Sequence, residues 1–128
     1  MSLRFTFAAG LGALALLAGC TSSSITNLTP QTVSRSPDGL YPIEARWDTG
    51  QRSIQGDSFT PYVVVGTQFY PMQRVATMTN HWEALLPVPA DKRFVNYQFK
   101  FDYDHKGTGS SRGDSLRTPN YQLEITGK

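Results

Sequence analysis

The stretch Val95-Asn96-Tyr97-Gln98-Phe99-Lys100-Phe101-Asp102-Tyr103 alternates apolar and polar residues from end to end. Successive side chains of a β-strand point to opposite faces, so the apolar residues of this stretch share one face. Apolar residues spaced two apart do not form the stripe of an amphipathic helix. The stretch therefore predicts a half-buried strand over residues 95–104. Its inward set is Val95, Tyr97, Phe99, Phe101 and Tyr103, and its outward set is Asn96, Gln98 and Lys100.

Further strands are predicted on both sides of this one. Some segments repeat the alternation of apolar and polar residues, and others are short runs of β-branched and aromatic residues bounded by glycine or proline. No segment after residue 20 shows a helical period. The predicted strands cover residues 25–28, 41–48, 62–65, 68–72, 82–87, 95–104 and 121–126.

Two turns are predicted between these strands. Gly66-Thr67 separates two apolar runs, which is typical of a two-residue hairpin turn with glycine first. Ser36-Pro37-Asp38-Gly39 lies within the irregular segment 31–39 and combines three turn-forming properties. Proline presets its own φ, aspartate can bond to backbone amides, and glycine accepts a positive φ.

About seven strands and no helix in roughly 100 residues indicate an all-β fold of sandwich type. The pattern resembles an immunoglobulin-like antiparallel β-sandwich of the kind that has no disulfide, since Cys20 is the only cysteine. A small antiparallel barrel is the alternative fold. Residues 25–128 are long enough for one domain with one core.

The N-terminal segment differs from the rest in composition. Phe5–Ala18 carries no charge and follows Arg4. The segment is shorter than the roughly 18 apolar residues that indicate a membrane-spanning helix, and its length suits the core of a signal peptide. The segment ends in Leu17-Ala18-Gly19-Cys20.

These four residues resemble, at every position, the lipobox of bacterial lipoprotein signal peptides. The resemblance implies a signal peptide over residues 1–19, cleavage before Cys20, and a lipid on its sulfur, with residues 20–24 as a lipidated tether. Two or three acyl chains anchor a protein far more firmly than one. In such families the next residue influences sorting, and Thr21 in place of aspartate favours the outer membrane, if the organism has one.

Charge and residue types exclude several functions. The chain has 12 Lys plus Arg and 10 Asp plus Glu, scattered without a basic block, so we expect no nucleic-acid partner. No G-x-S-x-G motif occurs, and His81 and His105 belong to no catalytic motif. Asp102, Asp104 and His105 form a D-x-D-H cluster that could bind a hard cation. We expect a solvated strand end there instead, and neither a cofactor nor a catalytic site.

A second resemblance concerns carbohydrate. Residues 82–89, Trp-Glu-Ala-Leu-Leu-Pro-Val-Pro, followed by Tyr97–Asp102, resemble the middle of glycogen- and starch-binding sandwich modules. The resemblance implies a carbohydrate-binding module as the alternative function. Exposed aromatic side chains in a row on one sheet face would favour it.

The segment 107–117 is rich in glycine and serine, which predicts a mobile loop. Binding residues tend to lie on loops carried by a rigid scaffold, so Arg112, Asp114 and Arg117 are candidate partner contacts. Together these features predict a lipid-anchored cell-envelope protein. Its non-catalytic sandwich is expected to bind or pack against another envelope component, either a protein or a glycan.

Overall fold

A computed structural model describes residues 23–50, 58–105 and 112–127. The predicted signal peptide and Cys20 lie outside these residues. The described residues form ten strands and no helix, and so contain no helix that could span a membrane. The strands are β1 (Ser23–Asn27), β2 (Thr32–Ser34), β3 (Leu40–Thr49), β4 (Thr60–Val65), β5 (Gln68–Pro71), β6 (Gln73–Arg74), β7 (His81–Pro87), β8 (Phe94–His105), β9 (Arg112–Arg117) and β10 (Tyr121–Thr126).

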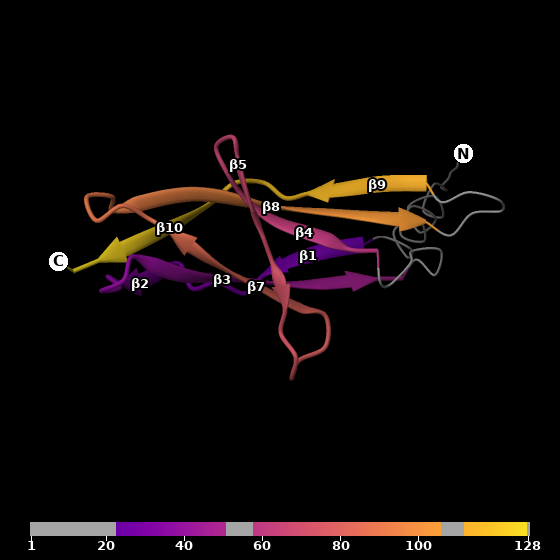
Figure 1. Ribbon diagram of the computed structural model, residues 1–128, viewed down its shortest axis with the longest axis horizontal. Helices are drawn as coiled ribbons and strands as arrows, with labels where there is room; N and C mark the ends of the chain where they lie inside the picture. The colour runs from indigo at the N-terminus through magenta and orange to yellow at the C-terminus, as the bar shows by residue number, and fades with distance from the viewer. Residues whose placement is uncertain (1–22, 51–57, 106–111, 128) are drawn as a thin grey trace, which may run out of the picture.

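The strands build two sheets that pack face to face (Figure 1). One sheet has the order β1-β3-β7-β6, and the other has the order β2-β10-β8-β4-β5, with β9 also paired to β8. These neighbours match those of immunoglobulin-like sandwiches if β9 and β10 together form the last strand. The predicted β-sandwich is therefore confirmed, with more strands than the seven expected.

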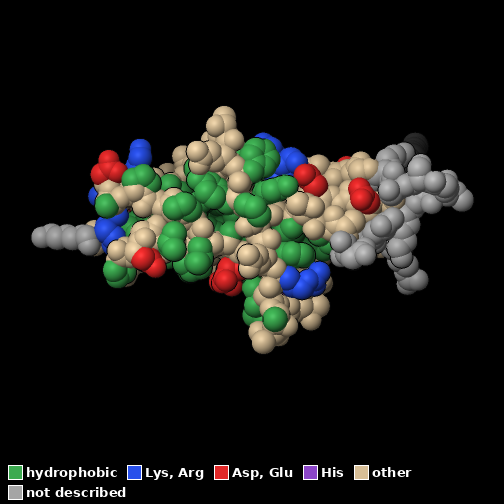
Figure 2. All heavy atoms as spheres, in the orientation of Figure 1, with side chains coloured by type: hydrophobic (Ala, Val, Ile, Leu, Met, Phe, Trp, Pro, Cys, Tyr) green, Lys and Arg blue, Asp and Glu red, His purple; other side chains and the backbone are tan. Residues whose placement is uncertain are grey.

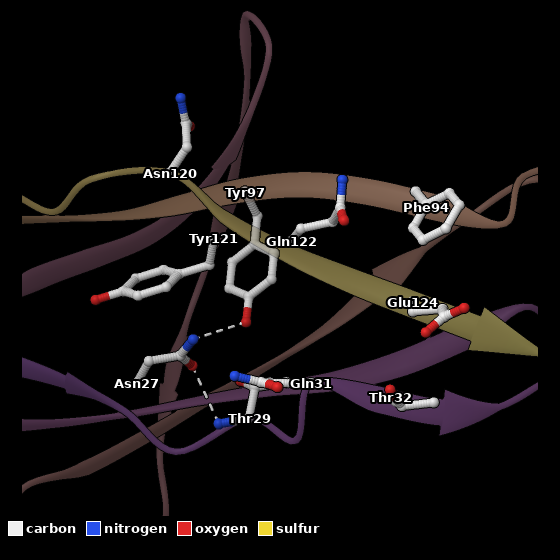
Figure 3. Close-up of a pocket in the computed structure, with 10 residues that line it drawn as sticks. All are labelled: Asn27, Thr29, Gln31, Thr32, Phe94, Tyr97, Asn120, Tyr121, Gln122 and Glu124. Carbon is white, nitrogen blue, oxygen red and sulfur yellow. Dashed lines mark hydrogen bonds between the residues drawn. The ribbon is translucent and has the colours of Figure 1, made fainter.

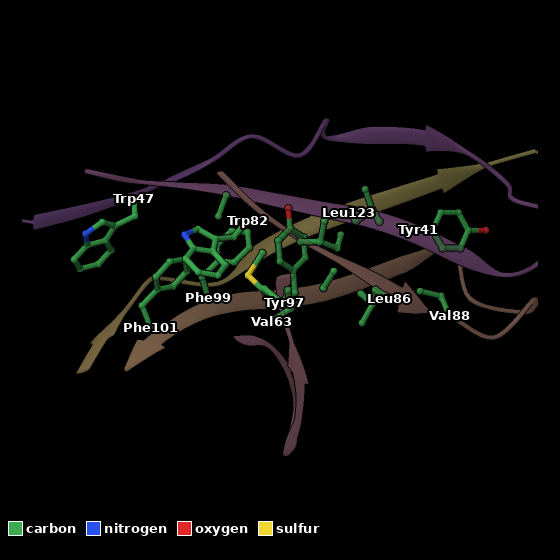
Figure 4. Packing of buried hydrophobic residues seen from close by; sticks show 14 of the residues in the cluster. Tyr41, Trp47, Val63, Trp82, Leu86, Val88, Tyr97, Phe99, Phe101 and Leu123 are labelled. Carbon is green, nitrogen blue, oxygen red and sulfur yellow. The ribbon is translucent and has the colours of Figure 1, made fainter. Parts of the chain in front are cut away.

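The inner faces of both sheets form the core. The inward set of β8 is confirmed: Phe99 and Phe101 are fully buried, and only Val95 is partly exposed. The Trp47 ring of β3 stacks on Phe101 at 5.5 Å between ring centroids. Figure 4 shows these rings side by side between the layers, so alternation in β3 and β8 produces one continuous aromatic core.

The chain changes sheets between β1 and β2. Thr29 is buried there, and its Oγ1 accepts a hydrogen bond from the Glu44 N–H at 2.9 Å and donates one to the Glu44 carbonyl at 3.2 Å. The Thr29 side chain thus replaces a strand partner for β3 where β1 ends. After Pro30 the chain continues as β2, which pairs in parallel with β10. β2 was not predicted from the sequence, because three residues are too few to show an alternation of apolar and polar side chains.

Both predicted turns are present. Gly39 has a φ of 73° and donates its N–H to the Ser36 carbonyl at 3.2 Å. The Ser36 hydroxyl, followed by the Leu40 N–H, lowers the pKa of the Asp38 carboxyl by hydrogen bonding to its ionised form. Gly66 has a φ of 60° and joins β4 to β5, as a glycine-first hairpin turn requires.

The prediction of a loop over residues 107–117 is wrong for residues 112–117, which form β9. This strand pairs with β8 from Lys100↔Arg117 to His105↔Arg112. Its sequence, Arg-Gly-Asp-Ser-Leu-Arg, has no alternation of apolar residues, so the cross-strand hydrogen bonds of β8 decide its conformation. Residues 106–111 lie outside the described residues.

A break at residues 118–120 separates β9 from β10. Pro119 has no N–H to donate, so it cannot continue the ladder. The Thr118 hydroxyl accepts from the Phe99 N–H at 2.9 Å, while its own N–H donates to the Phe99 carbonyl at 3.0 Å. Thr118 therefore satisfies both backbone groups of Phe99 across the break.

The two ends of the sandwich are distinct. At the Ser23 end, defined by Ser23, Thr49, His105 and Gly113, β1 starts and β8 finishes (Figure 1). At the Pro89 end, defined by residues 36–39, 88–93 and Gly127, the Val88 N–H donates to the Gly39 carbonyl at 2.9 Å. The Ile125 N–H donates to the Arg93 carbonyl at 2.7 Å, which joins β10 to this end.

Candidate functional site

A groove of about 600 Å³ lies where the chain crosses from β1 to β2 (Figure 3). We call it the crossover groove. Residues of the crossover form one wall, and β8 and β10 form the other. The residues that line it are Asn27, Thr29, Gln31, Thr32, Phe94, Tyr97, Asn120, Tyr121, Gln122 and Glu124.

Two side chains at the base of the groove are held by hydrogen bonds. The Asn27 Nδ2 donates to the Tyr97 hydroxyl at 2.9 Å, and the Asn27 Oδ1 accepts from the Thr29 N–H at 3.0 Å (Figure 3). Tyr97 is only 2% exposed, so its ring cannot move without disturbing the core. Its hydroxyl proton finds no acceptor within the described part of the chain. The base therefore offers a fixed, unused donor to whatever occupies the groove.

The walls carry more polar groups without partners. Among the described residues, Gln31, Asn120 and the Tyr121 hydroxyl have no side-chain hydrogen bond, and Gln31 and Asn120 are exposed. Glu124 is the one charged residue in the described lining, and Arg93 lies 3.3 Å from its carboxylate. The groove is thus polar with almost no net charge. Amides and hydroxyls both donate and accept, so they can bind a ligand of the same kind.

The candidate contacts on β9 do not form one surface. Arg117 lies opposite Lys100 on the outer face of the sheet, and its guanidinium donates to the Gln98 Oε1 at 3.0 Å. Asp114 lies opposite Tyr103 on the inner face, and its carboxylate is 3.3 Å from the His105 Nε2. The Arg112 backbone pairs with His105. Neither Asp114 nor Arg117 is among the residues that line the crossover groove.

Asp114 instead affects a core tyrosine. Burial raises the pKa of the Tyr103 hydroxyl, and the negative charge of Asp114 raises it further. As the pH rises, Tyr103 therefore ionises first in the unfolded chain, where its pKa has the ordinary value of 10.0. The contribution of Tyr103 to stability is present below that pH and is lost as the pH rises through the folded-state pKa.

We expect Asp114→Asn to lower the pKa of Tyr103, because the substitution removes the charge but keeps an acceptor for the Ser115 N–H. NMR titration of the tyrosine Cζ resonances between pH 8 and 12 measures the shift. Asp91→Asn, in the exposed turn at the Pro89 end, is the control and should leave Tyr103 unchanged. Identical Tyr103 titrations in the wild type and Asp114→Asn would show that burial alone sets this pKa.

The D-x-D-H cluster is not arranged as a metal site. Asp102 pairs with Lys100 at 2.5 Å, and the His105 Nε2 lies 3.3 Å from the carboxylate of Asp114, which is on β9. Within the described residues, no group of three or more His, Cys, Asp or Glu side chains could hold a metal ion. The Asp102 carboxylate is thus used for a pair with Lys100 on the same strand.

The residues that carry the resemblance to glycogen- and starch-binding modules lie in the core. Trp82 is 9% exposed, and Tyr97, Phe99 and Phe101 are at most 2% exposed, so their rings cannot serve as a sugar platform. The outer sheet face does carry Phe69, 45% exposed, whose ring meets the half-buried Tyr62 edge to face at 5.5 Å. An edge-to-face pair does not present the row of flat rings that would favour this family's mode of binding.

A second, more apolar groove of about 650 Å³ lies on the side of β5 and β7. Val65, Tyr70, Val88 and Phe94 are among the residues that line it, together with Lys92. Figure 2 shows hydrophobic side chains gathered along the middle of this side of the molecule. The apolar lining contrasts with the amides and hydroxyls of the crossover groove.

The crossover groove could not be predicted from sequence, because its residues come from three segments far apart in the chain. Tyr97 was expected in the core, where its ring lies, and its place in the lining of a groove was not expected. No protein-family model matches this chain, and no curated protein matches it.

Proposed function

We propose that this chain is a lipid-anchored cell-envelope protein whose β-sandwich binds another envelope component and catalyses no reaction. The observation that carries the binding role is the crossover groove, where Asn27 and Tyr97 are fixed and further amides and hydroxyls are unused. Preorganised groups such as Asn27 and Tyr97 favour binding because they lose little conformational entropy when a ligand arrives. The anchor at Cys20 and an outer-membrane location, where that membrane exists, are supported by the lipobox-like sequence.

β1 begins inside the segment that was predicted to be the tether. Residues 20–24 were expected to form it, but Ser23 and Ser24 belong to β1 and pair with Thr49 and Asp48. Only three residue steps separate Cys20 from Ser23, a reach of about 11 Å when fully extended. A lipid on Cys20 would hold the Ser23 end of the sandwich next to the membrane.

The test of the anchor compares the wild-type chain with Cys20→Ala in cells fed a clickable fatty acid. We expect label on the wild type and none on the variant, since no other cysteine can carry a thioether-linked lipid. The wild type should also float with membranes in a density gradient. Ser24→Ala, on β1, is the control and should keep its label. Equal labelling of wild type and Cys20→Ala would disprove the anchor.

The orientation has its own test. In the lipidated chain the native sulfur is occupied, so an added cysteine is the one free thiol for a fluorophore. We compare Gly113→Cys at the Ser23 end, where a Cβ meets nothing closer than 3.7 Å, with Ala90→Cys at the Pro89 end. The ten residues of β3 span roughly 30 Å between the ends. Spin-labelled lipid headgroups should quench the fluorophore at residue 113 far more than at residue 90.

Equal or reversed quenching in protein that floats with vesicles would show that the Ser23 end does not face the membrane. Protein that does not float would contradict the anchor itself. The two failures are therefore distinguishable in one experiment.

A further inference from the structure

We infer that the crossover groove binds a neutral oligosaccharide through its hydroxyl groups. This inference rests on the proposed binding function and assigns a ligand class to its site. It is carried by three features of the groove: the balance of donors and acceptors, the lack of net charge, and aromatic rings at its sides.

The balance of donors and acceptors fits sugar hydroxyls. The Tyr97 oxygen accepts from Asn27, so its proton remains to be donated. Asn27 uses one N–H for Tyr97, and its second N–H has no partner among the described residues. The Gln31 amide adds an acceptor and two donors beside them (Figure 3). A sugar hydroxyl both donates and accepts, and neighbouring hydroxyls can bond to both ends of one side-chain amide.

The lack of net charge argues against an ionic ligand. A phosphate, sulfate or uronate would need an unpaired cation, and none of the described residues that line the groove is Lys or Arg. A cation would need an unpaired carboxylate, and Glu124, the one carboxylate among the described lining residues, already faces Arg93 at 3.3 Å. We therefore expect the groove to prefer a neutral ligand, because a charged ligand would lose its hydration there without gaining a partner of opposite charge.

Aromatic side chains supply the remaining contact. The Tyr121 ring lies 5.8 Å from the Tyr97 ring and remains partly exposed at one side of the groove. Phe94, 46% exposed, also lines the groove, together with Glu124 (Figure 3). The C–H faces of pyranose rings are apolar and can pack on such side chains. The volume of about 600 Å³ lies in the range of small-molecule sites.

The test measures binding to the full chain by calorimetry, in a detergent without a sugar headgroup. The probes are maltohexaose, cellohexaose and N-acetylchitohexaose, with polygalacturonate as the charged comparison. We expect at least one neutral oligomer to bind at millimolar concentration or below, and more tightly than the charged polymer. Differences among the three neutral oligomers identify the sugar that the groove prefers.

Variants locate the site. Gln31→Ala and Asn120→Ala remove exposed amides of the groove and should each weaken binding about three- to tenfold, as loss of a neutral hydrogen bond does. Gln73→Ala, an exposed amide on β6 outside the groove, is the matched control and should bind like the wild type. Thermal melts confirm that all three variants fold.

Three results would overturn the inference: no binding of any neutral oligomer, tighter binding of polygalacturonate, or equal affinity in wild type, Gln31→Ala and Asn120→Ala. A chain that binds no sugar but forms a defined complex with an envelope protein would contradict the oligosaccharide inference alone. The broader binding function would then stand.

Discussion

Replacing Phe99 with alanine is expected to lower the free energy of unfolding by about 3–5 kcal/mol, the cost of a large cavity in a packed core. The Phe99 side chain is 0% exposed and lies in the centre of β8, between β4 and the break that follows β9. Its ring also packs against Tyr97 at 5.7 Å and Tyr121 at 6.0 Å. Neighbouring strands on both sides limit how far the core can collapse into the space.

The matched control for Phe99→Ala is Asn96→Ala, on the outward face of the same strand. Asn96 is exposed, so we expect a change below about 0.5 kcal/mol, as is usual for surface substitutions. Lys100 also faces outward but is less suitable, because it pairs with Asp102 and lies over the Phe69 ring at 5.9 Å. Chemical denaturation of the three proteins measures both effects. A larger loss in Asn96→Ala would mean that β8 presents its other face to the core.

The second large effect is expected at the sheet crossover. Thr29→Val keeps the shape of the side chain but removes the oxygen that bonds to both backbone groups of Glu44. The Glu44 carbonyl still accepts from the Leu28 N–H at 2.9 Å, whereas the Glu44 N–H loses the partner described for it. We expect a loss of about 1–3 kcal/mol, the cost of an unsatisfied buried donor.

Thr60→Val is the control for this substitution. Thr60 is an exposed strand residue, so exchange of its hydroxyl for a methyl should have little effect on stability. Denaturant melts give the stability of each variant, and hydrogen exchange of the Glu44 amide reports the bond directly. Unchanged protection of that amide in Thr29→Val would show that the hydroxyl does not hold the crossover.

Alternation was sufficient to predict the central strands. The residues of β3 and β8 are largely buried on one face and exposed or half-buried on the other. Burial of a single face imposes a period of two on the sequence. The turns at Gly39 and Gly66 were predicted for an equally local reason, since their positive φ values favour glycine.

Strands without an apolar face escaped prediction. β9 is an edge strand that packs little apolar surface beyond Leu116, so its composition resembles a loop. Its structure depends on hydrogen bonds to β8, which a single segment does not reveal. The strand conformation of β9 also places Asp114 and Arg117 on different faces of the sheet, because residues three apart in a strand point to opposite faces.

The sequence by itself determined the all-β class, the inward face of each long strand and the two glycine turns, because these depend on local periodicity and backbone sterics. It also supplied the lipobox-like segment on which the proposed anchor rests. Tertiary structure alone decided the crossover groove, where Asn27, Tyr97 and Tyr121 meet from β1, β8 and β10. Hydrogen-bond partners such as Thr29 and Glu44 are likewise decided by the pairing of β1 with β3, which brings residues together regardless of their separation in the chain.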